Sequence, residues 1–152
     1  MWRYRATIDG ARDALRLALG ASWASPVEAT LAECDVLAPC ALGGAICADD
    51  VGRIRASIVC GSANNQLADE SLAAELAQRG ILYAPDFVTN AGGLISVYRD
   101  LKGYSREHAI ELAEGIEESL AGVFEIAAAR GTTPLAAAHE LARERLEAAL
   151  RD

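Results

Sequence analysis

The stretch SIVCGSANNQL, residues 57–67, places two adjacent asparagines directly after an apolar run. SIVC has the composition of a buried strand, and the following ADESLAAELAQRG, residues 68–80, has the apolar period of a helix that ends on Gly80. A strand that leads through a polar loop into a helix is the repeating unit of a parallel α/β sheet. The carboxamides of the loop therefore either end the strand or contact a ligand beyond it.

Short strand-like segments alternate with helical segments on both sides of this stretch. Strands are expected at residues 3–9, 21–25, 35–39, 57–63 and 81–85. Helices, or helical turns, are expected between them at residues 11–20, 26–33, 48–56 and 68–80. Ser25 and Pro26 are typical of a helix start, and Gly20 of a helix end. This alternation predicts an α/β fold built on a doubly wound parallel sheet.

The last part of the chain, residues 86–152, has a helical period throughout. Its first segment carries a Gly-Gly pair inside the helical pattern, and two long amphipathic helices follow it. Ser105 and the Thr133–Pro134 pair are expected at the starts of these two helices. We therefore expect one domain of 152 residues, in which a parallel sheet is followed by long C-terminal helices.

Composition and charge argue against several functional classes. The formal net charge of −8 and the pI of about 4.8 disfavour binding to the nucleic-acid backbone. No apolar run approaches the roughly 20 residues of a membrane span, and no apolar signal core follows the first charges. His108 and His139 lie far apart in helical segments. We expect no nucleic-acid partner, no membrane partner and no metal site.

The cysteines form no CxxC pair and lie in or beside strand-like runs. They are Cys34, Cys40, Cys47 and Cys60. This spacing predicts reduced, buried thiols in a cytoplasmic protein.

Polar residues follow several of the predicted strands, at the edge where open parallel sheets bind their ligands. Asp9, Pro39–Cys40 and Ser62–Asn65 are all in such positions. The Asp9 carboxylate could accept two hydrogen bonds from a ribose diol, or it could simply end its strand. In APCALGG, residues 38–44, the two glycines either let the backbone pass close to a ligand or belong to an ordinary tight loop.

The asparagines and a glycine pair leave similar alternatives open. Asn64 and Asn65 suit a nicotinamide carboxamide, a ribose hydroxyl or an amine, and Asn64 could equally cap the strand end. Gly92 and Gly93 each cost roughly 1 kcal/mol relative to alanine in a helix, which either a ligand or a second helix close to the backbone would explain. No glycine-rich fingerprint, P-loop or catalytic motif occurs in the chain. The residues alone indicate a small-molecule-binding α/β domain.

Four motifs taken together resemble a known family. CDVLAPCALGG, GSANNQLAD, RGILYAPDFVTNAGG and LISVYRDLKGYSRE resemble the dinucleotide-binding domain of the glutamate/leucine/phenylalanine/valine dehydrogenases, and are most similar to bacterial leucine and valine dehydrogenases. The resemblance extends over residues 6–146. It implies a Rossmann-like fold and the reversible oxidative deamination of an L-amino acid to its 2-oxo acid and ammonia, with NAD as hydride acceptor.

The resemblance also implies site residues. Those at the family's cofactor-binding positions are Asp9, Cys40, Ala41, Leu42, Ala63, Asn64 and Asn90. Those at its substrate-binding positions are Asn65, Gly92, Gly93, Leu94 and Val97. Asp9 would hold the adenine ribose and Asn65 would lie near the substrate amine. The aliphatic pair Leu94 and Val97 favours a branched-chain substrate and does not separate leucine from valine.

The chain also departs from the family pattern. The family's catalytic lysine and aspartate belong to an N-terminal domain to which nothing in these residues corresponds, so no catalytic residue is predicted here. The family's first strand and glycine-rich turn should precede Arg3, and a βαβ unit needs about 30 residues. Without that strand, the strands at 3–9 and 35–39 lose their shared neighbour, and each should expose an unpaired edge. We therefore expect an incomplete Rossmann-like domain at residues 1–152, with residues 86–152 as its helical part.

Two functional hypotheses follow. The first is a fragment of a branched-chain amino-acid dehydrogenase that is inactive alone, from a parent that is a homo-oligomer. The second is a non-catalytic binding or assembly module, or half of a split enzyme that pairs with a separate N-terminal catalytic chain.

Overall fold

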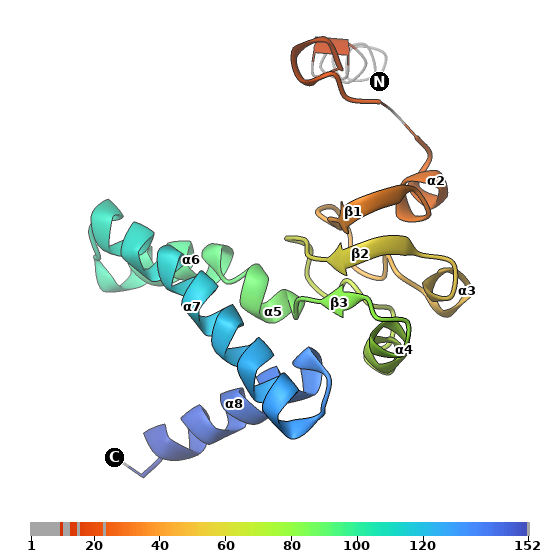
Figure 1. Ribbon diagram of the computed structural model, residues 1–152. Coiled ribbons are helices and arrows are strands. Elements are labelled where there is room, and N and C mark those ends of the chain that lie inside the picture. Colours follow the sequence, from red (N-terminus) through yellow and green to blue (C-terminus); the bar gives the residue numbers. More distant parts are fainter. Residues whose placement is uncertain (1–9, 11–12, 15, 23, 152) are drawn as a thin grey trace.

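The computed structural model describes residues 10, 13–14, 16–22 and 24–151. The strand expected at residues 3–9, including Asp9, lies outside the described residues. The first described elements alternate as α2 (Pro26–Thr30), β1 (Glu33–Leu37), α3 (Ala48–Val51), β2 (Arg55–Val59), α4 (Leu72–Gln78) and β3 (Leu82–Tyr83). The three strands form a parallel sheet in the order β1-β2-β3 (Figure 1). The predicted α/β class with a parallel sheet is confirmed.

Helix starts and ends follow the local sequence signals. Ser25 caps α2 through a capping box with Glu28, and Pro26 occupies the first turn. Gly80 follows α4 with φ +72°, and Gly20 has φ +64°, a left-handed conformation that glycine adopts without a steric penalty.

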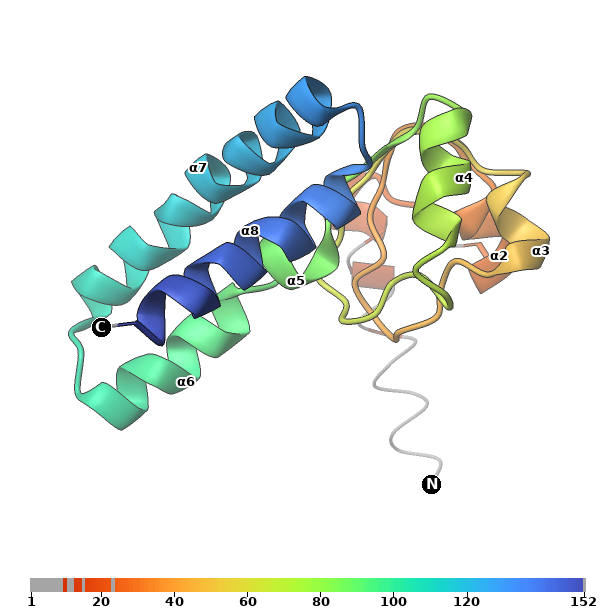
Figure 2. The ribbon, with the colours of Figure 1, turned by 90° about the horizontal axis from the view of Figure 1, so that it is seen from below.

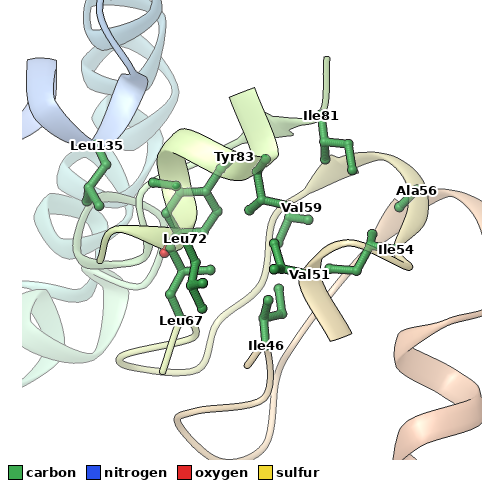
Figure 3. Close-up of a cluster of buried hydrophobic side chains, with 12 residues drawn as sticks. Ile46, Val51, Ile54, Ala56, Val59, Leu67, Leu72, Ile81, Tyr83 and Leu135 are labelled. Carbon is green, nitrogen blue, oxygen red and sulfur yellow. The ribbon is translucent and has the colours of Figure 1, made fainter. Parts of the chain in front are cut away.

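The main core lies between the sheet and helices α3 and α4. Figure 3 shows Val51 of α3, Leu72 of α4 and Val59 of β2 converging on one apolar cluster. Burial of such side chains is the main favourable term in folding. Leu135, from the last helix, belongs to the same cluster although the other members come from residues 46–83. The last helix thus contributes one side chain, Leu135, to the core of the sheet.

The helical part consists of α5 (Asp86–Thr89), α6 (Gly92–Lys102), α7 (Arg106–Arg130) and α8 (Pro134–Ala149). Ser105 and Thr133 cap α7 and α8 as the sequence predicts. Figures 1 and 2 show α6, α7 and α8 extending away from the sheet. A second, smaller apolar cluster joins α7 to α8 through Val123 and Ala138. The prediction of long C-terminal helices is confirmed.

One face of the sheet carries an apolar row that is not fully covered. Val36, Ile58 and Leu82 are aligned across the three strands by the sheet register, so their side chains share a face. Val36 is 49% exposed and Leu82 is 39% exposed. Parallel sheets normally have both faces covered by helices. Within the described residues, β1 also has β2 as its one neighbour, which leaves its other edge unpaired.

Several local expectations were wrong. The described residues of 21–25 form no strand, because that segment runs between the glycine that ends one helical stretch and the serine that caps α2, and has no sheet neighbour. By contrast, the one or two helical turns expected within residues 48–56 are present as a single turn, α3, and residues from Arg55 onward pair in the sheet. The helix expected through 86–104 is divided into α5 and α6 around Asn90 and Ala91.

The cysteines are free thiols as expected, but none is fully buried. Cys40 is exposed, and Cys34, Cys47 and Cys60 are half-buried. The reason is that β1 lies at the sheet edge and the loops after β1 and β2 face outward. None of the described helices is long and apolar enough to cross a membrane.

Candidate functional site

Loops that follow neighbouring strands meet at the carboxyl end of the sheet. The Ala63 backbone N–H donates to the Pro39 carbonyl over 3.0 Å, and the Gly44 N–H donates to the Asn65 carbonyl over 2.7 Å. These bonds join the loop after β1 to the loop after β2. The predicted site residues 40–42 and 63–65 therefore belong to adjacent loops, at the edge where open parallel sheets bind ligands.

Two glycines allow these loops to approach so closely. A Cβ at Gly61 would lie 2.1 Å from the Pro39 carbonyl oxygen, and a Cβ at Gly43 would lie 2.8 Å from the Asn64 carbonyl oxygen. Both distances are shorter than a Cβ can tolerate against backbone. For Gly43 the close neighbour is the backbone of the adjacent loop, whereas the sequence suggested a ligand or an ordinary tight loop; Gly61 was not singled out, although it too follows a predicted strand.

Asn90 connects the loop after β2 to the helical part. Its Nδ2 donates to Asn64 Oδ1 over 2.6 Å and to the Ala63 carbonyl over 3.4 Å. Because Asn90 donates and Asn64 accepts, the pair retains the Asn64 Nδ2 donors and the Asn90 Oδ1 acceptor for other partners. The structure thus brings together Asn64 and Asn90, which the sequence placed in the same site from positions far apart in the chain.

Asn65 has a backbone conformation that is uncommon outside glycine. Its φ is +52°, the left-handed region in which asparagine is tolerated better than most residues. An asparagine at this position therefore has a local structural role in addition to any contact with a ligand. Ala63, two residues earlier, is buried, so it supports the loop from inside.

Gln66 and Asp86 hold the loop after β2 through hydrogen bonds from its buried side. The sequence analysis identified neither residue. Gln66 Nε2 donates to the carbonyls of Gly61 and Ala63, over 2.7 and 3.1 Å. The Gln66 backbone N–H donates to Asp86 Oδ2 over 2.8 Å. The available signal was weak: a glutamine between an asparagine and a leucine, and an aspartate after a proline, are ordinary surface patterns.

The Cys40 thiol lies at the exposed mouth of these loops. Hydrogen bonds from Ser62, first from its hydroxyl and then from its backbone, lower the pKa of Cys40 below the usual thiol value. The Cys40 sulfur is therefore more readily ionised than an ordinary exposed cysteine. Burial, and then the nearby Asp86 carboxylate, raise the pKa of Tyr83, which keeps this phenol neutral beneath the site.

The predicted substrate positions on α6 are open to solvent. No other described residue comes within 4 Å of a Cβ placed on Gly92 or Gly93, so the alternative of a close helix–helix contact is not observed. Leu94 is 73% exposed and Val97 is 57% exposed, three residues apart on one face of α6. Leu42, one of the predicted cofactor positions, is 82% exposed. The structure places these apolar residues at the surface, outside both buried clusters.

The chemistry available at this edge is hydrogen bonding. Among the described residues, no group of three or more histidine, cysteine, aspartate or glutamate side chains is arranged to hold a metal ion. A separate apolar groove of about 700 Å³ lies between α5, α7 and α8, where it is lined by residues such as Phe87, Ile116 and Leu141. The strand-end loops therefore form a polar binding edge next to an apolar helical surface.

Comparison with known proteins gives consistent matches. The family described as Glutamate/Leucine/Phenylalanine/Valine dehydrogenase matches residues 9–152. A leucine dehydrogenase of Thermoactinomyces intermedius is 45% identical over 128 residues, which are 84% of this chain and 35% of that protein. A valine dehydrogenase of Streptomyces coelicolor is 46% identical over 112 residues, 74% of this chain and 31% of that protein.

A third relative has a solved structure. The L-tryptophan dehydrogenase of Nostoc punctiforme is 44% identical over 128 residues, 84% of this chain and 36% of that protein. Its crystal structure superimposes with a TM-score of 0.86 at 40% identity, covering 92% of this chain and 43% of the solved one. The chain thus spans about a third of the length of the curated relatives that it matches.

Proposed function

This chain belongs to the Glutamate/Leucine/Phenylalanine/Valine dehydrogenase family, and from that membership we propose that its strand-end loops bind NAD as part of an amino-acid dehydrogenase. The single observation that supports this best is the Asn64–Asn90 pair. It retains amide donors on Asn64 and a carbonyl acceptor on Asn90, which complement the acceptor and donors of a nicotinamide carboxamide. Bound NAD would accept a hydride from the substrate.

Three other proposed cofactor positions belong to the loop next to this pair. Cys40, Ala41 and Leu42 belong to the loop that the Ala63–Pro39 hydrogen bond holds beside Asn64. We assign them to the nicotinamide ribose, and we assign the adenine ribose to Asp9, which lies outside the described residues. Asn65, in the next position of the loop, is assigned to the substrate amine.

The substrate is proposed to be a branched-chain L-amino acid such as leucine or valine. Leu94 and Val97 are uncharged and aliphatic, so they suit an aliphatic side chain better than a carboxylate, which requires a basic partner. Gly92 and Gly93 begin α6 with open space above them, which would let a substrate approach the backbone. A tryptophan dehydrogenase among the relatives makes an aromatic substrate the rival.

The isolated chain is proposed to be inactive in catalysis. The proposed site residues offer hydrogen bonds to ligands, and the family resemblance assigns the catalytic lysine and aspartate to an N-terminal domain and not to these loops. The test is an assay of the purified chain with L-leucine, L-valine or L-tryptophan and NAD, followed at 340 nm. We expect no NADH formation above the baseline, and steady turnover by the chain alone would contradict the proposal.

Binding is tested separately from turnover. Calorimetric titration of the chain with NAD should give weak binding. The reason is that a glycine-rich turn at a helix N-terminus normally holds the pyrophosphate, and no such turn occurs in this sequence. An Asn64→Leu variant removes the carboxamide and should abolish the residual heat. Submicromolar affinity would contradict the assignment of an incomplete site.

A second candidate function is assembly with a separate chain, and the sheet itself supports it. The Leu37 carbonyl accepts a hydrogen bond from the Cys60 N–H, so the backbone groups of Leu37 face β2. Successive residues of a strand direct their N–H and C=O groups to opposite sides, so those of Cys34 and Val36 face the open edge of β1. The test is coexpression with the N-terminal part of a leucine dehydrogenase. A stable complex with dehydrogenase activity would support assembly, whereas two chains that purify separately would not. A homo-oligomeric parent and a cytoplasmic location remain predictions.

A further inference from the structure

A small polar network is buried beneath the strand-end loops. In the part of the chain that the structure describes, Gln66 and Asp86 are the two buried residues with strongly polar side chains, at 0% and 9% exposure. Burying such groups costs free energy unless hydrogen bonds replace those lost to water. Both side chains direct those hydrogen bonds to the backbone of the loop after β2.

The bonds converge on the part of the loop that carries the asparagines. Gln66 Nε2 donates to the Gly61 carbonyl, and the Thr89 hydroxyl donates to that same carbonyl over 3.0 Å. The second Nε2 bond reaches the Ala63 carbonyl, directly before Asn64. The Asp86 carboxylate accepts a hydrogen bond from the backbone N–H of Gln66, the residue directly after Asn65. The two asparagines are therefore held on both sides by a glutamine and an aspartate whose side chains are themselves buried.

We propose that Gln66 and Asp86 are positioning residues, which hold the Asn64–Asn65 turn in the conformation that presents its carboxamides to a dinucleotide. This inference deepens the proposed function and rests on it for the identity of the ligand. The positioning itself rests on the hydrogen bonds alone. Neither side chain contacts the ligand, because both are buried below the loop.

The choice of residue types follows from what each bond requires. One side-chain amide nitrogen supplies two donors, which is the number that the Gly61 and Ala63 carbonyls need. Gln66 Oε1 has no hydrogen-bond partner among the described residues, so it is the nitrogen of this side chain that holds the loop. Asp86 needs only an acceptor, which an asparagine could also supply.

The backbone of Asn65 depends on this support. A positive φ at a residue with a side chain persists only where surrounding contacts enforce it. Two hydrogen bonds flank Asn65 at this turn. The Gly44 N–H donates to the Asn65 carbonyl, and the Gln66 backbone N–H donates to the buried Asp86 carboxylate. Loss of the bond between the Gln66 N–H and Asp86 should therefore let Asn65 return to an ordinary negative φ. The Gly44 N–H would then lose its partner, the Asn65 carbonyl.

The experiment uses ¹⁵N,¹³C-labelled full chain and four variants. Gln66→Met removes both donors at similar volume, and Asp86→Leu removes the acceptor. Asp86→Asn keeps an acceptor oxygen, and Ile54→Val loosens the core without touching the loop. NMR reports the positive φ of Asn65 through its strong intraresidue NOE between the amide proton and Hα, and reports the Gly44 hydrogen bond through amide exchange.

In Gln66→Met and Asp86→Leu we expect loss of the Asn65 signature and roughly tenfold faster exchange of the Gly44 amide. Asp86→Asn should restore both readouts, and Ile54→Val should leave both unchanged despite a lower melting temperature. A Gln66→Met protein that folds and retains the wild-type Asn65 signature would overturn the proposal. If these variants unfold, Gln66→Asn takes their place, because it keeps an uncharged carboxamide but shortens the side chain by one methylene, and the same loss of the Asn65 signature is expected.

A second arm separates this inference from the proposed function. NAD is added to the wild-type chain and to Gln66→Met, and the amide shifts of Asn64, Asn65 and Asn90 are followed. Shifts in the wild type that are lost in the variant support both statements. If the wild type shows no shifts, the NAD assignment fails, while the NOE and exchange data still decide the positioning role.

Discussion

Asn90 donates its side-chain amide to Asn64 over 2.6 Å, although 26 positions separate the two residues in the chain. The bond fastens the junction of α5 and α6 to the loop beyond β2. Through it, the helical part of the molecule is set relative to the sheet at the edge where the ligand is proposed to bind. Two residues that are distant in the sequence are thus in direct contact in the fold.

Breaking this bond should weaken the fold measurably. Asn90→Leu removes the donor and leaves Asn64 Oδ1 and the Ala63 carbonyl without it. We expect the free energy of unfolding to fall by about 1 kcal/mol, the usual net value of such a hydrogen bond. Urea denaturation followed by circular dichroism measures this. An unchanged midpoint, with an unchanged slope, would mean that the bond is not formed in solution.

Gly61 should tolerate no side chain. A Cβ at this position would lie 2.1 Å from the Pro39 carbonyl oxygen, which is backbone and cannot swing away. Gly61→Ala should therefore cost about 3 kcal/mol or prevent folding. The matched control is Gly122→Ala, inside α7 with nothing within 4 Å, which should stabilise by roughly 0.5–1 kcal/mol. Equal effects of the two substitutions in thermal denaturation would refute the close packing of the loops.

Cys40 should react with alkylating agents at a lower pH than an ordinary thiol. The Ser62 hydrogen bonds favour the thiolate and lower the pKa of Cys40. Ser62→Ala removes the hydroxyl bond, so the pKa should rise and the rate-against-pH curve for iodoacetamide should move to higher pH. Mass spectrometry of the peptide that contains Cys40 measures the rate separately from the other thiols. A curve that stays in place would show that the hydroxyl does not contact the sulfur.

The apolar row across the sheet should promote self-association. Val36 is 49% exposed and Leu82 is 39% exposed on one face of the sheet, and exposed apolar patches favour contact with other chains. Val36→Lys should reduce self-association in sedimentation velocity runs at high concentration, while it changes stability by no more than about 0.5 kcal/mol. Val36→Ile keeps the apolar surface and serves as the control. If both variants associate like the wild type, the row is not the contact surface.

The sequence predicted the alternation of helices and strands from residue 26 to residue 85, and the edge of the sheet at which residues 40–42 and 63–65 meet. Regular signals made this possible: Ser25 and Pro26 at a helix start, Gly80 at a helix end, and asparagines after an apolar run. It also predicted that residues 40–42 and 63–65 would share one edge, because parallel strands direct their carboxyl ends to the same side.

What the sequence could not show was the support beneath that edge. The partners of Gln66 lie at Gly61, Ala63 and Asp86, and the last of these comes from another element. No periodicity marks a polar residue that is buried by tertiary contacts. Likewise, the strand expected at 21–25 failed because strand propensity acts only where a neighbouring strand offers hydrogen bonds.

The position of Leu135 affects how the chain can fold as it is synthesised. This residue, on the last helix, completes a core whose other members all lie between residues 46 and 83. A ribosome must therefore add some fifty further residues before the core of the sheet can close, and its exit tunnel must release them. During that interval the core of the nascent sheet lacks one of its buried side chains, which the far end of the same polypeptide supplies. Chaperone binding to stalled chains that end before and after this helix would show that dependence directly.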